Sequence, residues 1–173
     1  MGNDFLTLAH ARYSCRKIRN DVPVEPEKLD AIAEAALAAP TGCNFQPWRL
    51  WVITDPIALE KTRSATGFKF GGSAMLVLGV RPDEAWTRKY DDWNIADIDG
   101  GIVGAHILLA VESLGLATTW IGKFHQDQLK EAFPQMEGCR LVAMFPIGYA
   151  AEDAVPAAHH AESRAEAELV ERI

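Results

Sequence analysis

Apolar and polar residues alternate along the chain in short blocks that predict helices alternating with strands. In residues 26–39 the apolar positions recur at helical spacing until Pro40 stops the helix. Segments 48–54 and 140–147 are rich in β-branched and aromatic residues and predict strands, whereas 74–80 is apolar throughout, as in a strand buried on both faces. Further helices are predicted at 4–11, 55–65 and 126–133, a short strand at 118–121, a loop at 67–72 and a helical tail at 162–173. Four or five strands with helices between them predict a sandwich of the α+β or α/β class in one domain, 1–173.

The segment 97–114 predicts a long helix of a different kind, because it is apolar on nearly all sides. A helix of this composition is buried inside a protein or an oligomer. It contains Gly100, Gly101 and Gly104, each of which costs about 1 kcal/mol of helix stability relative to alanine. Such a cost is tolerated where another group must approach the helix backbone closely, and Gly115 is expected to end the helix.

Composition narrows the class of protein. The chain has 173 residues, of which 49% are apolar, so a folded core is expected and global disorder is excluded. The formal net charge of −7 argues against a general nucleic-acid binder. Three cysteines without a C-x-x-C pair indicate a reducing compartment. The most apolar stretch, 100–116, contains His106 and Glu112 and is too short to cross a bilayer, so we expect a soluble cytoplasmic protein.

The first cluster of candidate functional residues lies at 12–19, where four of the 17 basic residues fall within eight positions. Arg12 and Arg16 share a face if the segment is helical, and Ser14 joins them if it is extended. Two guanidinium groups then converge with no carboxylate between them, which favours an external anion, and arginine suits phosphate. The alternative is a solvated basic patch paired with carboxylates from elsewhere in the chain.

Two further segments combine polar groups with backbone turns. Residues 39–48 form a loop between a helix and a strand, and its hydroxyl and amide groups could bind both donor and acceptor edges of a heterocycle. Residues 115–124 contain a strand that ends at Gly122, where the backbone can touch a flat ligand. Ordinary turns remain an alternative for both segments.

Other catalytic patterns are missing from the sequence. There is no G-x-S-x-G, H-E-x-x-H or G-x-x-x-x-G-K-[ST] motif. The pair His159–His160 has no third ligand nearby, so no metal site is predicted. Asp97 and Asp99 are expected to cap the buried helix.

Taken together and in this order, the segments resemble the FMN-dependent nitroreductase family over nearly the whole chain. The motifs that carry the resemblance are R-Y-S-C-R-K-I at 12–18, A-P-T-G-C-N-F-Q-P-W at 39–48, D-I-D-G-G at 97–101, G-L-A-T-T-W-I-G at 115–122, and I-G-Y-A at 147–150 followed by Arg164. The resemblance implies a small, single-domain α+β sandwich with a central mixed or antiparallel sheet of four to five strands flanked by helices. It also implies a homodimer with two FMN sites at the subunit interface and the apolar helix in the dimer core.

The same resemblance implies roles for individual residues. The flavin phosphate and part of the ring would be held by Arg12, Tyr13, Ser14 and Arg16, with Arg164 joining at the phosphate. The flavin would be approached by Pro40, Thr41, Gly42, Asn44 and Gln46, with the 40–44 part coming from the partner subunit. The ring would lie, near its N5 atom, against Ile121, Gly122 and Lys123. Arg164 has an alternative partner in Glu168, which follows it at i+4.

The activity that the resemblance implies is an NAD(P)H-dependent FMN oxidoreductase that reduces a nitroaromatic, quinone or enone-type acceptor by a ping-pong mechanism. No protein side chain is assigned as an obligatory acid or base. The alternatives are a specialised flavin enzyme acting on one metabolite, of the reductive dehalogenase or flavin-destroying type, and a non-catalytic flavin-binding protein. The segment 82–94 stands where larger members build a substrate lid.

Overall fold

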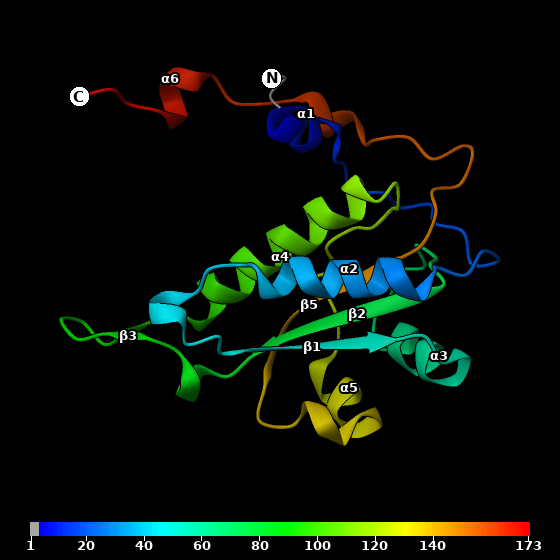
Figure 1. The fold of residues 1–173 in the computed structure, drawn as a ribbon, viewed down its shortest axis with the longest axis horizontal. Helices are drawn as coiled ribbons and strands as arrows, with labels where there is room; N and C mark the ends of the chain where they lie inside the picture. Colours follow the sequence, from blue (N-terminus) through cyan, green and yellow to red (C-terminus); the bar gives the residue numbers. More distant parts are fainter. Residues whose placement is uncertain (1–3) are drawn as a thin grey trace.

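A three-stranded antiparallel sheet lies at the centre of the protein, which is described by a computed structural model over residues 4–173. The strands are β1 (Trp48–Ile53), β2 (Ala74–Val80) and β5 (Arg140–Ile147), in the spatial order β1-β2-β5 (Figure 1). Every residue of β2 is buried, as its continuous apolar run predicts.

Helices cover both faces of this sheet (Figure 1). On one face lie α2 (Pro26–Leu37) and α4 (Ala96–Ser113), and α1 (Asp4–Ala11) packs against α4. On the other face lie α3 (Pro56–Ser64) and α5 (Gln126–Ala132). Side chains of β2 alternate between the two cores: Leu76 and Leu78 face α2 and α4, whereas Met75 and Val77 face α3 and α5. The expected α+β class and the positions of these five helices are confirmed.

The segment 82–94, which stands where larger family members build a substrate lid, contains a small hairpin. Its strands are β3 (Thr87–Arg88) and β4 (Trp93–Asn94), which pair in an antiparallel manner. The remaining elements are short: the 3₁₀ turns η1 (Gly42–Asn44), η2 (Pro82–Glu84), η3 (Pro134–Met136) and η4 (Ala158–Ala161), and the helix α6 (Glu166–Leu169).

The prediction of a strand at 118–121 is wrong, and the central sheet therefore has three strands instead of four or five. The segment still runs beside β5, but it pairs only through the isolated bridges Ala117–Gly148 and Ile121–Met144. Midway between these bridges, residue 119 would face Pro146. Proline has no backbone N–H, so the ladder is interrupted at that point.

The prediction of a helical tail over 162–173 is also largely wrong. Only α6 is helical, and all residues from 155 to 173 are exposed. A short helix gains most of its stability by packing an apolar face, and this tail has no surface of its own chain to pack on. In Figure 1 the tail runs past α1 and away from the sheet.

No helix described between residues 4 and 173 is both long enough and apolar enough to span a membrane.

Helix α4 packs closely against Trp120 at Gly104. A Cβ atom at Gly104 would lie 2.2 Å from Cζ3 of the Trp120 ring, and this ring is held edge-on against Phe145 with 5.1 Å between ring centroids. We therefore expect Gly104→Ala to lower the free energy of unfolding by about 1–3 kcal/mol, despite the better helix propensity of alanine. Urea denaturation measures the change.

The matched control is Gly101→Ala on the same helix, because a Cβ there meets no atom within 4 Å in the single chain. This substitution should leave the stability unchanged or raise it by up to about 1 kcal/mol. An equal loss in both variants would contradict the assignment of the cost to the Trp120 ring.

Candidate functional site

The basic segment that follows α1 is fixed by backbone hydrogen bonds to three other parts of the chain. The N–H of Cys15 donates to Thr118 O at 2.9 Å, and the N–H of Ile18 donates to Phe70 O at 2.8 Å. The N–H of Arg19 donates to Tyr149 O at 2.8 Å. The first predicted cluster is thereby placed beside the loop at 67–72 and beside the segment that leads to Ile121.

Two of the four basic residues in this segment lack a carboxylate partner. Lys17 forms an ion pair with Asp153, and Arg19 forms one with Asp21 at 2.9 Å. Arg12 and Arg16 form no ion pair with any residue from 4 to 173, and the Arg16 guanidinium donates only a 3.3 Å hydrogen bond to Ser14 O. Half of the cluster is thus a solvated patch paired with carboxylates, whereas Arg12 and Arg16 have no such partner among the described residues.

Two histidines of the C-terminal tail, His159 and His160, lie beside this cluster. A cavity of 220 Å³ is lined by Ser14, Arg16, Ala157, His159 and His160. The ring of His160 lies edge-on to Tyr13, with 6.2 Å between centroids. Burial raises the pKa of Tyr13 to about 12. Its phenol is neutral near pH 7, as an ordinary tyrosine is, and can donate a hydrogen bond. A metal role for the two histidines was not predicted, and no group of three or more metal-ligating side chains is clustered within the described part of the chain.

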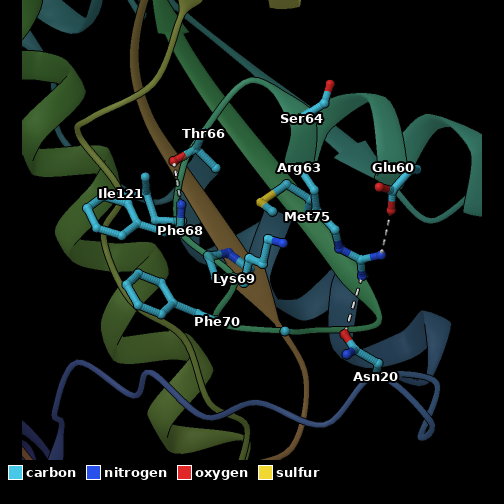
Figure 2. Close-up of a pocket in the computed structure, with 12 residues that line it drawn as sticks. Asn20, Glu60, Arg63, Ser64, Thr66, Phe68, Lys69, Phe70, Met75 and Ile121 are labelled. Atoms are coloured by element: carbon cyan, nitrogen blue, oxygen red, sulfur yellow. Dashed lines mark hydrogen bonds and ion pairs between the residues drawn. The ribbon is translucent and has the colours of Figure 1, made fainter.

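A larger cavity of 490 Å³ lies beside the loop at 67–72 (Figure 2). It is lined by Asn20, Glu60, Arg63, Ser64, Thr66, Phe68, Lys69, Phe70, Gly71, Met75, Ile121 and Pro146. The rings of Phe68 and Phe70 are stacked at 5.0 Å, and Phe68 is 40% exposed. Thr66 donates a 2.9 Å hydrogen bond to Lys123 O, which ties this loop to the third predicted segment. Ile121 lines the cavity, and Gly122 and Lys123 are exposed beside it.

Two basic side chains line this cavity, and only one of them has a carboxylate nearby among the described residues. Arg63 donates to Gly72 O and to Asn20 at 3.5 Å, and its guanidinium lies 3.9 Å from Glu60 (Figure 2). Lys69 projects into the same space and has no carboxylate partner within residues 4–173. The cavity therefore offers a flat apolar surface with a free positive charge beside it.

The second predicted cluster is a strained loop at 40–46. Cys43, Asn44 and Gln46 all have positive φ values, of 50°, 57° and 51°, which side chains other than glycine seldom adopt. Side chains hold the loop in this shape: Gln46 N donates to Thr41 Oγ1 at 3.0 Å, and Gln46 Nε2 donates to Asn44 Oδ1 at 3.0 Å. The amides of Asn44 and Gln46 are exposed, so they are free to meet a ligand from outside.

The predicted capping roles of Asp97 and Asp99 are wrong. The residue before α4 is Ile95, and no side chain caps the helix there. Asp97 is exposed and pairs with Arg140 at 2.9 Å. Asp99 lies one turn inside the helix, where its Oδ1 atom accepts a 2.9 Å hydrogen bond from the N–H of Gly42.

Helix α4 separates the loop at 40–46 from the cluster at 12–16 within one chain. Asp99 in its first turn contacts Gly42, whereas Thr118, just beyond its end, contacts Cys15. Eighteen residues at about 1.5 Å each make α4 about 27 Å long. The loop is therefore bonded to the first turn of α4, and the cluster is bonded to the segment that follows this helix.

A family model matches most of the chain. The family model described as the nitroreductase family matches residues 9–67 and 60–149. The chain belongs to the nitroreductase family.

Relatives of this nitroreductase-family protein cover most of its length. A protein of Archaeoglobus fulgidus, provisionally named an NADH dehydrogenase/NAD(P)H nitroreductase, is 31% identical over 138 residues, which are 77% of this chain and 75% of the relative. A crystal structure of a nitroreductase family protein from Clostridium difficile is 32% identical, with a TM-score of 0.87 over 96% of each chain. A provisional nitroreductase from Desulfovibrio desulfuricans, solved in complex with FMN, shares the fold at 22% identity, with a TM-score of 0.80 over 100% of this chain and 98% of that one.

The protomer assembles only part of the predicted site. Arg12, Tyr13, Ser14 and Arg16 lie together, and Ile121, Gly122 and Lys123 lie on a neighbouring segment. Arg164 does not join them, because its guanidinium pairs with Glu168 at 2.8 Å in the exposed tail. Pro40, Thr41, Gly42, Asn44 and Gln46 lie at the far end of α4.

Ile121 is the one lining residue of the larger cavity that the sequence analysis named, and Arg63, Phe68 and Lys69 are among those it missed. A signal was present, because the loop places one lysine between two phenylalanines among glycines. The sequence alone does not show that this loop borders Ile121, since that contact is made between segments more than fifty residues apart.

Proposed function

We propose that this protein is an NAD(P)H-dependent oxidoreductase that binds FMN and reduces a nitroaromatic, quinone or enone-type acceptor by a ping-pong mechanism. The observation that carries the proposal is the pair of arginines on either side of Ser14, both without a carboxylate partner among residues 4–173 of a chain whose net charge is −7. An acidic protein that keeps two guanidinium groups unpaired within one short segment offers a site for an anion such as a phosphate.

The residues at the cluster fit the phosphate end of FMN. Arg12 and Arg16 supply charge, Ser14 supplies a hydroxyl, and the neutral phenol of Tyr13 supplies a further donor. From there the ring would extend toward Ile121, where the chain presents backbone next to an open cavity. When bound, FMN supplies the hydride-transfer chemistry, and the protein supplies position and electrostatics. The protein shares its fold with the nitroreductase of Desulfovibrio desulfuricans that was solved in complex with FMN, which supports FMN as the ligand.

A homodimer would complete the site and cover the exposed apolar surface. The loop with the amides of Asn44 and Gln46 is bonded to the first turn of α4 and not to its own chain's cluster, and a second copy would supply these amides. An apolar groove of 410 Å³ between α1, α2 and α4 lies open in the protomer and includes Phe5 and Leu109. The exposed tail, which carries Ile173, would lie against the second copy.

The experiment that tests the function begins with the purified protein. The ligand released by denaturation should be FMN by chromatography, and light scattering should give the mass of a dimer. NAD(P)H should be oxidised steadily once a quinone or nitroaromatic acceptor is added. A colourless protein that cannot be reconstituted with FMN would rule out the proposal, and bound FMN without any NAD(P)H oxidation would favour the non-catalytic flavin-binding alternative.

Replacing Arg12 or Arg16 should weaken the binding of FMN much more than the binding of riboflavin, which lacks the phosphate. Arg12→Gln or Arg16→Gln removes a charge-assisted contact worth about 1.5–3 kcal/mol, so the affinity for FMN should fall by about 10- to 150-fold. Riboflavin affinity should change little. Fluorescence titration of the apoprotein measures both. Equal losses for the two flavins would mean that the cluster supports the fold or the ring and does not bind the phosphate.

Two other arginines serve as references in that titration. Arg19→Gln should have little effect on either flavin, because Arg19 already pairs with Asp21 at the surface. Arg164→Gln discriminates between two roles. If dimerisation brings Arg164 to the phosphate of the partner site, its variant will behave like that of Arg12, and if Arg164 only pairs with Glu168, its variant will behave like that of Arg19.

The larger cavity would receive the second substrate, and the free charge of Lys69 should favour acidic acceptors. Lys69→Gln should lower kcat/KM for 4-nitrobenzoate about 2- to 5-fold relative to neutral 4-nitrobenzamide, as for an exposed ion pair. Lys61→Gln on α3 is the matched control, because Lys61 is also exposed but lies outside this cavity. Equal changes for both acceptors would remove Lys69 from acceptor selection.

A further inference from the structure

Asp99 is a carboxylate buried in the first turn of α4, where its side chain is only 1% exposed. Its Oδ1 atom accepts the hydrogen bond from Gly42 N, and its Oδ2 atom is buried without a hydrogen-bond partner among residues 4–173. Burial of a carboxylate is costly unless the group is paired. The N-terminal end of the α4 dipole offsets part of the cost, and the bond to Gly42 is the specific contact that the side chain makes.

The loop that Asp99 holds is under strain. Cys43, Asn44 and Gln46 all have left-handed backbone conformations, which persist only where neighbouring groups enforce them. Gly42 begins η1 of this loop, and a Cβ there would meet Ile95 Cδ1 at 2.5 Å. The Asp99 hydrogen bond and the close packing on Ile95 therefore attach the start of the loop to the N-terminal end of α4.

We propose that Asp99 is a positioning residue that holds the 40–46 loop in the shape in which its Asn44 and Gln46 amides meet the flavin of the partner subunit. This inference rests on the proposed function. Asp99 itself touches neither flavin nor substrate. It acts through Gly42, and its effect on one site therefore appears in the flavin bound by the other chain.

The first test compares three variants by titration of FMN into the apoprotein. Asp99→Ala removes the acceptor of the Gly42 N–H, so the affinity for FMN should fall about 10-fold or more. Asp99→Asn keeps an oxygen that can accept this hydrogen bond, and it should bind FMN within about 3-fold of the wild type. Asp97→Ala is the matched control, because Asp97 lies in the same turn, is exposed and pairs only with Arg140.

The second test is complementation between subunits. Asp99→Ala has an intact phosphate cluster and a defective loop, whereas Arg12→Gln has the reverse defects. In a mixed dimer one site combines the intact cluster of the first chain with the intact loop of the second. Statistical reassociation of equal amounts should therefore produce about one tight FMN site per four chains, although neither variant alone has any. A variant that had failed to fold would not restore a site in this way.

Three results would overturn the inference: FMN affinity of Asp99→Ala equal to that of the wild type, equally weak binding by Asp99→Asn and Asp99→Ala, and a mixture without tight sites. A separate readout needs no flavin. Limited proteolysis within residues 40–46 should be about 10-fold faster in Asp99→Ala than in Asp97→Ala, because the loop opens locally without its attachment. If the wild type binds no FMN, the proposed function fails and the flavin role of Asp99 fails with it, while faster cleavage still supports the attachment of the loop by Asp99.

Discussion

The burial of strand β2 on both faces is the constraint on which the rest of the structure depends. All seven residues of Ala74–Val80 are buried, so each face of the sheet needs a cover of helices. Leu76 and Leu78 require α2 and α4 on one side, and Met75 and Val77 require α3 and α5 on the other. The loop at 66–72 leads into this buried strand, and the segment with the hairpin at 82–94 follows it.

The position of the candidate site depends on where the backbone N–H and C=O groups beside β5 find their hydrogen-bond partners. The ladder beside β5 is interrupted at Pro146, so the segment from 117 to 121 pairs with β5 only at its two ends. Its remaining groups are used elsewhere, as where Thr118 O accepts from Cys15 N. The largely buried segment at 117–121 and the exposed residues that follow it thereby draw the basic cluster and the Phe-rich loop to the same edge.

The two parts of the proposed site both lie along helix α4. Helix α4 carries Asp99 and its bound loop at one end and leads to the segment that meets the basic cluster at the other. In the proposed dimer the loop would serve the cluster of the other chain. A dimer that covers α4 and the open groove beside it would bring a loop from one chain to the cluster of the other. The same contact between subunits would thus both bury this apolar surface and complete the site.

Much of this protein is determined by local sequence. The apolar run at 74–80, the helical spacing at 26–39 and the proline at position 40 each act within a few residues, so their elements were predicted with nearly correct bounds. The motifs likewise identified the family and the two unpaired arginines. Tertiary structure decided what depends on distant partners. Pro146 prevents the strand at 118–121 because it lies opposite, and Asp99 binds Gly42 instead of capping its helix because folding brings a loop fifty-seven residues away to its side chain. Lys69 borders a cavity because residue 66 bonds to residue 123. A pattern of neighbours along the chain carries no information about such pairs, since their energies depend on which surfaces the packed layers bring together.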